Sequence, residues 1–228
     1  MANFNTVIFD LDGLLIDSEP LWEEAETQVF ARYGVHITKD ICLKVKGFRV
    51  DESIRLIHRL FPFPNPDFTF IEQQILEEVK RLIREKGKGM PGCVYILHFF
   101  KSRNFKLALA SSSKLEIIYT ALEKLNIEQH FDCIHSAENE PFGKPHPGIF
   151  LTAASRLQSD PSSCIVFEDS LNGVIAGRAA RMTTVAIPDP EVFEHKGFGI
   201  AHLRLTSLLQ FKELHLYSLG NSELYHSS

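Results

Sequence analysis

Short apolar runs alternate with helical patterns in the second part of the chain, and this alternation most constrains the fold. The strand-like runs cover residues 106–110, 131–136, 164–167 and 184–187, and helical patterns cover 94–103, 115–125, 148–157 and 171–181. A further apolar run, residues 6–11, lies near the N-terminus. Runs this short and apolar are typical of buried parallel strands. Because such a series builds a parallel sheet with helices on both faces, the sequence predicts a Rossmann-like, doubly wound α/β fold.

A helical block separates the first predicted strand from the others. Apolar residues recur at helical spacing in residues 19–33 and 51–60, and a charged helix is predicted over about 70–86. Three prolines in residues 61–68 break any helix there. We therefore expect an α/β core domain, residues 1–14 and 89–220, and an all-helical domain, residues 15–88, inserted at the edge of the sheet. Residues 221–228 are expected to fray.

Polar side chains gather where the predicted strands end. They are, in chain order, Asp10, Asp12 and Gly13 after the first strand, Ser111, Ser112 and Ser113 after the second, Lys144 in a Gly-Lys-Pro turn, and Glu168 and Asp169 after the strand at 164–167. Ligands of parallel sheets bind outside the carboxyl ends of the strands. We therefore expect these side chains to share one site.

The residue types in this set suit phosphoryl transfer. Carboxylates bind a hard divalent cation such as Mg²⁺, a hydroxyl and an ammonium group hold phosphate oxygens, and one carboxylate is left to attack. Asp10 and Asp12 are two residues apart on an extended segment, so their side chains lie on one face. A cation between them would offset their repulsion, and Gly13 would let the backbone turn toward the phosphate.

The strings FDLDG, LALAS, GKPHP and VFEDS resemble, in order and separation, the four motifs of the haloacid dehalogenase superfamily. The resemblance covers nearly the whole chain, and the helical block is similar to that superfamily's C1-type cap. It points to the branch that contains β-phosphoglucomutase and sugar-phosphate phosphatases. The strings DGLLIDSEPLW and FEDSLNGVIAGRAARM look especially like those of bacterial 2-deoxyglucose-6-phosphate and hexitol phosphatases.

The resemblance implies a role for each motif residue. Asp10 would be the nucleophile, and Asp12 the general acid that protonates the leaving alkoxide and then activates water. The phosphate clamp would fall on Ser111 and Lys144, assisted by the backbone amide of Ser112. The serines also have a structural interpretation, since a serine before the helix at 115–125 is a common N-cap.

The resemblance implies a magnesium site and a substrate-reading segment as well. Asp10, the backbone carbonyl of Asp12 and Asp169 would bind Mg²⁺, with Glu168 binding through a water. In the resembling family the loop around Gly47 and Arg49 reads the substrate, so we expect Arg49 to contact sugar hydroxyls or a second anionic group. Trp22 opens the helical block close to the first strand and is a candidate for lining the substrate pocket.

Family membership leaves several reactions open. The main hypothesis is hydrolysis of a small phosphomonoester, a sugar or sugar-alcohol phosphate, through an aspartyl-phosphate intermediate. A β-phosphoglucomutase-like isomerase is the first alternative; against it, Trp22 stands where the mutase has a histidine, and Arg49 is displaced by one position. A phosphonatase would need a cap lysine in an apolar setting, for which Lys46 is the candidate. A regulatory protein that binds a phosphorylated metabolite without turnover is the remaining alternative.

Composition bounds the partners. Lys and Arg number 24 and Asp and Glu number 29, a formal charge of 24 − 29 = −5. This balance gives no electrostatic reason to expect nucleic acid or an anionic membrane as a partner.

The four cysteines are dispersed, without metal-ligand spacing, so we expect reduced thiols. No targeting or membrane-spanning segment is evident, and we expect a cytoplasmic monomer whose terminal apolar segment, residues 208–219, packs on its own domain.

Overall fold

The computed structural model describes residues 4–221 and has the α/β architecture that the sequence predicts. The strands are β1 Thr6–Phe9, β2 Lys106–Ser111, β3 Cys133–Ser136, β4 Cys164–Glu168, β5 Thr183–Ala186 and β6 Leu203–Arg204. The helices are α1 Glu19–Ala31, α2 Lys39–Val45, α3 Val50–Leu60, α4 Phe68–Lys86, α5 Cys93–Lys101, α6 Leu115–Leu125, α7 Gly148–Arg156, α8 Leu171–Ala179 and α9 Glu213–Asn221. Short 3₁₀ turns connect several of them.

All six strands form one parallel sheet in the order β3-β2-β1-β4-β5-β6. The strand β1 lies between β2 and β4, with Phe9 in register with Leu109 on one side and Phe167 on the other. The chain changes direction across the sheet between β1 and β4, which is the switch point where ligands of doubly wound sheets bind. The segments after β1, β2 and β4 are therefore the ones placed to form a site.

Both faces of the sheet are covered, because successive side chains of a strand point to opposite faces. Val7 and Phe9 of β1 pack in one cluster with residues of α5 and α6, whereas Ile8 packs in a second cluster with residues of α7 and α8. Phe9 also stacks on Phe167, with ring centroids 5.2 Å apart. The near-continuous apolar character of the strands follows from this burial on both sides.

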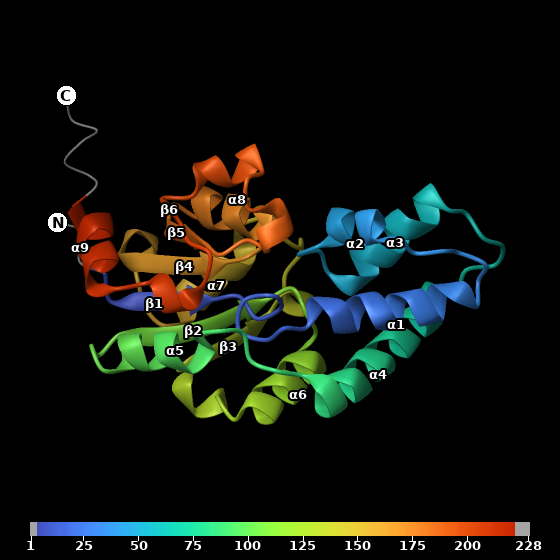
Figure 1. The fold of residues 1–228 in the computed structure, drawn as a ribbon, viewed down its shortest axis with the longest axis horizontal. Coiled ribbons are helices and arrows are strands. Elements are labelled where there is room, and N and C mark those ends of the chain that lie inside the picture. The colour runs from blue at the N-terminus through green and yellow to red at the C-terminus, as the bar shows by residue number, and fades with distance from the viewer. Residues whose placement is uncertain (1–3, 222–228) are drawn as a thin grey trace.

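The helices α1–α4 lie together beyond one edge of the sheet, and α9 lies at the opposite end of the molecule (Figure 1). The helices α1 and α4 pack side by side through residues such as Val29, Phe30, Ile75 and Val79, all of which are buried. Two chain segments join this helical block to the sheet, and they run next to each other. Ile16 bridges Gly89, and the amide of Met90 donates to the carbonyl of Leu15 over 2.9 Å.

Two elements were missed in the sequence. The helix α2 contains a Cys and two β-branched residues among seven, a composition that gave no helical signal by itself, and β6 is only two residues long. In the terminal segment Leu208, Phe211 and Leu219 are buried as expected, but Leu209 and Leu214 are exposed. The predicted fraying concerns residues 222–228, which lie outside the described residues, and Asn221, which ends α9.

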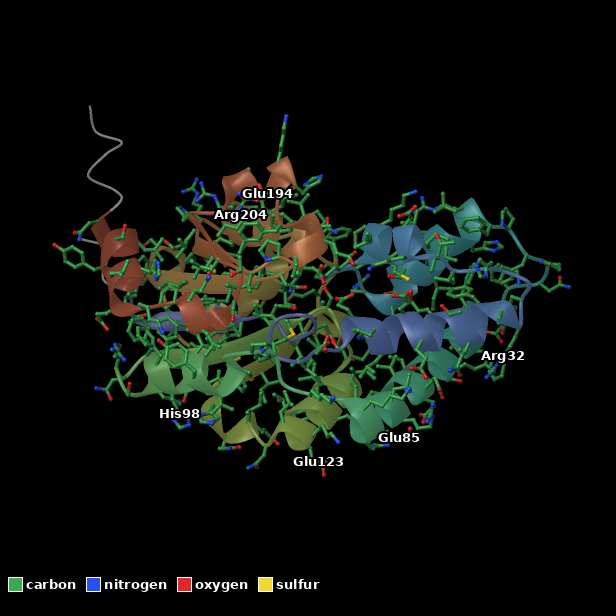
Figure 2. The ribbon with its side chains drawn as sticks, viewed as in Figure 1. Arg32, Glu85, His98, Glu123, Glu194 and Arg204 are labelled. Carbon is green, nitrogen blue, oxygen red and sulfur yellow. The ribbon has the colours of Figure 1, made fainter. Side chains whose placement is uncertain are left out.

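Charge is distributed unevenly. Figure 2 shows Arg32, Glu85, His98 and Glu123 at the rim of the ribbon, where all four side chains are exposed to solvent. The four cysteines are free thiols, in agreement with the sequence-based expectation. Within residues 4–221 no helix is both long and apolar enough to cross a membrane. In contrast to these exposed side chains, one cluster of charged side chains is buried, at the carboxyl ends of the strands.

Candidate active site

The predicted motif residues meet at the carboxyl ends of β1 and β4. Lys144, in the loop before α7, places its Nζ atom 2.5 Å from Oδ1 of Asp10 and 2.6 Å from Oε1 of Glu168. All three side chains are buried, and Lys144 is 2% exposed. A buried ammonium group between two carboxylates offsets charge that neither could carry alone in this environment. Residues separated by more than 130 positions in the chain therefore form one ionic cluster.

The Asp12 carboxylate lies beside this cluster and is held by its own donors. Its Oδ1 accepts from Ser18 Oγ at 2.7 Å and from Trp22 Nε1 at 3.0 Å, and its Oδ2 accepts from Ser113 Oγ at 2.7 Å. Ser111 Oγ approaches the same Oδ2 at 3.3 Å. These four donors come from both the helical block and the core. They fix the orientation of a side chain at the position proposed for the general acid.

Three carboxylates cluster closely enough to share a cation. Asp10, Glu168 and Asp169 each offer an oxygen, and these oxygens lie within 4.8 Å of one another. Burial raises the pKa of Asp10 well above its ordinary value, with Lys144 opposing the rise and Glu168 adding to it. Burial likewise raises the pKa of Asp169 to about 6. Carboxylates that are forced together in this way are typical ligands of a hard cation.

One carboxylate oxygen of this cluster indicates whether the site fits a metal ion. Asp169 Oδ2 is buried and accepts no well-formed hydrogen bond from the described residues, although Lys46 Nζ forms an ion pair with it at 2.7 Å. Glu168 is more fully engaged, since Lys144 binds Oε1 while the amides of Asp169 and Ser170 donate to Oε2. The donor set thus fits a divalent cation, with Asp10 and Asp169 as the residues that have an oxygen free to bind it.

The serines after β2 line the same site. Ser111, Ser112 and Ser113 all border the cavity that contains Asp10 and Asp12. Ser111 Oγ accepts the amide of Ser113 at 3.0 Å, so the turn holds itself in place. The expectation that a serine caps the next helix is wrong: the N-cap of α6 is Lys114, which makes no side-chain cap hydrogen bond. The hydroxyls of Ser111 and Ser113 donate to Asp12 instead, and that of Ser112 donates to the carbonyl of Gly47.

Two glycines are required by close contacts at the site. Gly13 has φ +74°, and a Cβ atom there would lie 2.2 Å from Asp169 Oδ2. Gly47 has φ +80°, and a Cβ atom there would lie 2.7 Å from Ser170 Oγ. The carbonyl of Gly47 also accepts from Ser112 Oγ at 2.8 Å. The segment around Gly47 therefore rests on the core loops that carry Ser112 and Ser170.

Arg49 is placed differently from what the sequence suggested. Its guanidinium donates to the backbone carbonyls of Ala137 and Glu140, at 3.4 and 3.0 Å, and pairs with Glu52 at 3.1 Å. It does not border the cavity that contains Asp10. In this arrangement the side chain joins the helical block to the core, and the expected contact of Arg49 with substrate stays a prediction. Sequence alone could not separate these roles, because both use a partly buried arginine.

A cavity of about 70 Å³ lies over Asp10 and Asp12. Trp22 borders it, as anticipated, but the hydrogen bond from its indole to Asp12 was not foreseen. Ser113, which the sequence groups with Ser111 and Ser112, also lines it, whereas the lining residues Lys46 and Glu26 were not predicted as site residues of the phosphatase. Lys46 stands next to Gly47, which was a usable signal. Glu26 had none, because one acidic residue on a helix is usually solvated.

Comparison with known proteins agrees with these features. The family model described as "Haloacid dehalogenase-like hydrolase" matches residues 7–187. This chain belongs to that family. It is an enzyme of the hydrolase class by this membership, as the motifs predicted. The isomerase and regulatory alternatives are not separated by family membership alone.

Individual relatives narrow the comparison. Hexitol phosphatase B of Escherichia coli (strain K12) is 36% identical over 204 residues, covering 89% of this chain and 92% of that protein. A phosphorylated carbohydrates phosphatase of Thermotoga maritima is 36% identical over 174 residues, covering 76% and 80%. Among solved structures, β-phosphoglucomutase from Clostridium difficile superposes with a TM-score of 0.86 at 27% identity, covering 98% of this chain and all of that one.

Glu26 gives a prediction for stability. Burial, and secondarily Glu23, raises its pKa to about 7 from an ordinary value of 4.5. The folded state therefore binds more protons than the unfolded state between these values, and stability falls as the pH rises through that window. We expect Glu26→Gln to increase the free energy of unfolding at pH 8 by up to about 3 kcal/mol. Urea denaturation at pH 8 and pH 4.5 measures this, and the gain should disappear at pH 4.5.

Proposed function

We propose that this protein is a Mg²⁺-dependent phosphatase of small phosphomonoesters, specifically of sugar or sugar-alcohol phosphates. The observation that carries the proposal is the convergence of Asp10, Asp12 and Asp169 on one cavity, with Lys144 bonded to Asp10 from the buried side. Two relatives with 36% identity, named for the hydrolysis of hexitol phosphates and phosphorylated carbohydrates, support the substrate class. The cavity lies beneath the helical block, a position consistent with a small phosphate ester whose remaining groups are uncharged.

Asp10 is the nucleophile in the proposed reaction. Its Oδ1 is bound by Lys144, while its Oδ2 accepts no hydrogen bond from the described residues and remains for attack. Oδ2 forms a bond to phosphorus as the bond between phosphorus and the ester oxygen breaks. Asp12 donates its proton to the departing alkoxide. The products of this half-reaction are the free alcohol and an aspartyl phosphate on Asp10.

Water completes the cycle. Asp12, now a carboxylate, takes a proton from a water molecule whose oxygen attacks phosphorus, and the bond from phosphorus to Asp10 breaks to release inorganic phosphate. The donors Ser18, Trp22 and Ser113 keep the Asp12 carboxylate facing the reacting oxygen in both steps. Ser111 and the amide of Ser112 are the proposed phosphate ligands, together with Lys144.

The metal would be held by Asp10 and Asp169, with Glu168 behind them and the backbone carbonyl of Asp12 completing the set. When bound, Mg²⁺ offsets the charge that accumulates on the transferring phosphoryl group. Lys46 Nζ lies 2.7 Å from Asp169 and 3.9 Å from Glu19. This cap lysine is paired with carboxylates, which argues against the uncharged amine that phosphonatase chemistry requires.

Residues 15–88 act as a cap in this proposal. The cavity of about 70 Å³ is far smaller than the roughly 300 Å³ at which typical ligand pockets begin, so substrate entry requires the cap to move. The paired segments at Ile16 and Gly89 are the proposed hinge. The hydrogen bonds of Arg49 with Ala137 and Glu140, and of Ser112 with Gly47, hold the closed arrangement.

The proposal is tested by release of inorganic phosphate from sorbitol 6-phosphate, 2-deoxyglucose 6-phosphate and an aryl phosphate. We expect turnover with 5 mM Mg²⁺ and a loss of at least about 10³-fold after EDTA treatment, because the carboxylate cluster then repels the phosphate dianion. Adding Mg²⁺ back should restore the rate. Metal-independent turnover, or none on a broad panel, would contradict the proposal, and formation of glucose 6-phosphate from glucose 1-phosphate would favour the isomerase.

A further inference from the structure

One face of α1 forms a wall of the cavity that contains Asp10 and Asp12. Glu19, Trp22, Glu23 and Glu26 follow one another at helical spacing and all border the cavity. Glu26 is 6% exposed, and no hydrogen bond to its carboxylate occurs within residues 4–221. Ser53 of α3, 4% exposed, borders the cavity as well and likewise makes no side-chain hydrogen bond in the described part of the chain. The carboxylate of Glu26 and the hydroxyl of Ser53 are thus open to the cavity, where a ligand group can supply their hydrogen-bond partners.

The charges around the cavity restrict what this ligand group can be. Within the described residues, Lys46 is the one cationic side chain that borders the cavity, and it is paired with Asp169 at the metal end. Arg49, the next cation in the cap segment, is bonded to core carbonyls instead. A second phosphate or carboxylate on the substrate would therefore lie against Glu23 and Glu26 without a counter-ion, and would be rejected by like-charge repulsion.

Hydroxyl groups of a substrate can satisfy the hydrogen-bonding groups of this cavity wall. A carboxylate accepts hydrogen bonds from hydroxyls through both of its oxygens, and the Ser53 hydroxyl can donate or accept. Trp22 also borders the cavity, and its aromatic ring offers apolar surface that suits the carbon chain of a polyol. Desolvation also raises the pKa of Glu26 to about 7, so this carboxyl group can donate as well as accept near neutral pH. This mixed capacity matches hydroxyls better than an ammonium group.

We propose that Glu26, with Glu23 and Ser53, recognises the hydroxyls at the uncharged end of the substrate and excludes substrates that carry a second anionic group. This inference rests on the proposed function and assigns its selectivity to a named wall of the cap. It predicts that neutral hexitol and hexose monophosphates are substrates, whereas bisphosphates and phosphorylated sugar acids are not. A mutase, which must bind a sugar bisphosphate, is disfavoured by the same wall.

The test compares two esters that differ only at the end remote from phosphate: sorbitol 6-phosphate, with a terminal hydroxymethyl group, and 6-phosphogluconate, with a carboxylate. We expect kcat/KM to favour sorbitol 6-phosphate by about 100-fold or more, the range expected when one ligand leaves buried polar groups unpaired. Glu26→Gln should reduce this ratio at least tenfold, mainly through a higher rate on 6-phosphogluconate. Glu23→Gln should reduce it in the same direction, and provides a second variant if Glu26→Gln folds poorly.

Glu24→Gln is the matched control, since Glu24 lies on the same helix but pairs with Lys86 outside the cavity at 2.7 Å. It should leave the ratio unchanged. An aryl phosphate substrate separates the two proposals: loss of turnover on every ester contradicts the phosphatase itself. If the aryl phosphate is turned over, three results would overturn the inference but not the phosphatase activity. They are equal rates on both six-carbon esters, no turnover of either ester, and a clear preference for 2-amino-2-deoxyglucitol 6-phosphate.

Discussion

Asp10→Asn is expected to lower phosphatase turnover by at least about 10⁴-fold while the protein stays folded. The amide has the same shape as the carboxylate but is a poor nucleophile, so the covalent route is lost. Folding should be retained, since burial and the neighbouring carboxylates already raise the pKa of Asp10 and so favour an uncharged side chain at this position. Initial rates of phosphate release from sorbitol 6-phosphate, with urea denaturation of the same samples, provide the two measurements.

A radiolabelled substrate adds a direct readout. Acid quenching of the wild-type reaction should trap labelled phosphate on the protein in an amount that tracks Asp10, and the variant should trap none. Asp189→Asn serves as a control because Asp189 is an exposed residue that caps a short 3₁₀ turn. Turnover of Asp10→Asn at the wild-type rate would remove Asp10 from the nucleophile's role.

Lys144→Met is expected to affect both stability and activity. The ammonium group is buried between Asp10 and Glu168, at 2.5 and 2.6 Å, and its loss leaves two buried carboxylates without their counter-ion. Breaking a buried ion pair from one side costs about 3–5 kcal/mol, and we expect a fall of that size in the free energy of unfolding at pH 8. Phosphate release should fall by about 10³-fold or more, because the clamp on the phosphoryl oxygens is incomplete.

The pH dependence distinguishes this mechanism from simple loss of packing. Burial raises the pKa of Asp10, so lowering the pH protonates it and removes part of the uncompensated charge. The stability deficit of Lys144→Met should therefore shrink from pH 8 to pH 5. Lys101→Met removes an exposed lysine that pairs with Asp132 at 2.8 Å, and should change stability by less than about 1 kcal/mol. A deficit that is equal at both pH values would indicate a packing effect instead.

The fold was predictable from the chain because its strands and helices have strong local signals. The runs at 106–110 and 164–167 are apolar on both faces, and strands with that pattern must be buried on both sides, which the doubly wound sheet provides. The helix α2 and strand β6 were missed since neither is long enough to show a period. Their positions depend on packing against elements that are distant in the sequence.

The positions of the candidate site residues were predictable where strand topology fixes them. They were not predictable where a side chain can reach more than one partner. Asp10, Ser111 and Asp169 follow strands, and parallel strands deliver their ends to one edge, so sequence order was enough to place them together. Arg49 could reach a substrate or the core, and the carbonyls of Ala137 and Glu140 decided between them. A long flexible side chain leaves that choice to the surrounding structure.

The sequence by itself determined the α/β fold, the inserted helical block and the set of groups available for phosphoryl transfer, because periodicity and residue order are local properties of the chain. Only the tertiary structure decided that Trp22 hydrogen bonds to Asp12, that Lys46 reaches Asp169, and that Glu26 faces the cavity without a partner. All three features lie at the boundary between the helical block and the α/β core. Burial and charge at such a boundary depend on what lies opposite, and a linear pattern does not contain that information.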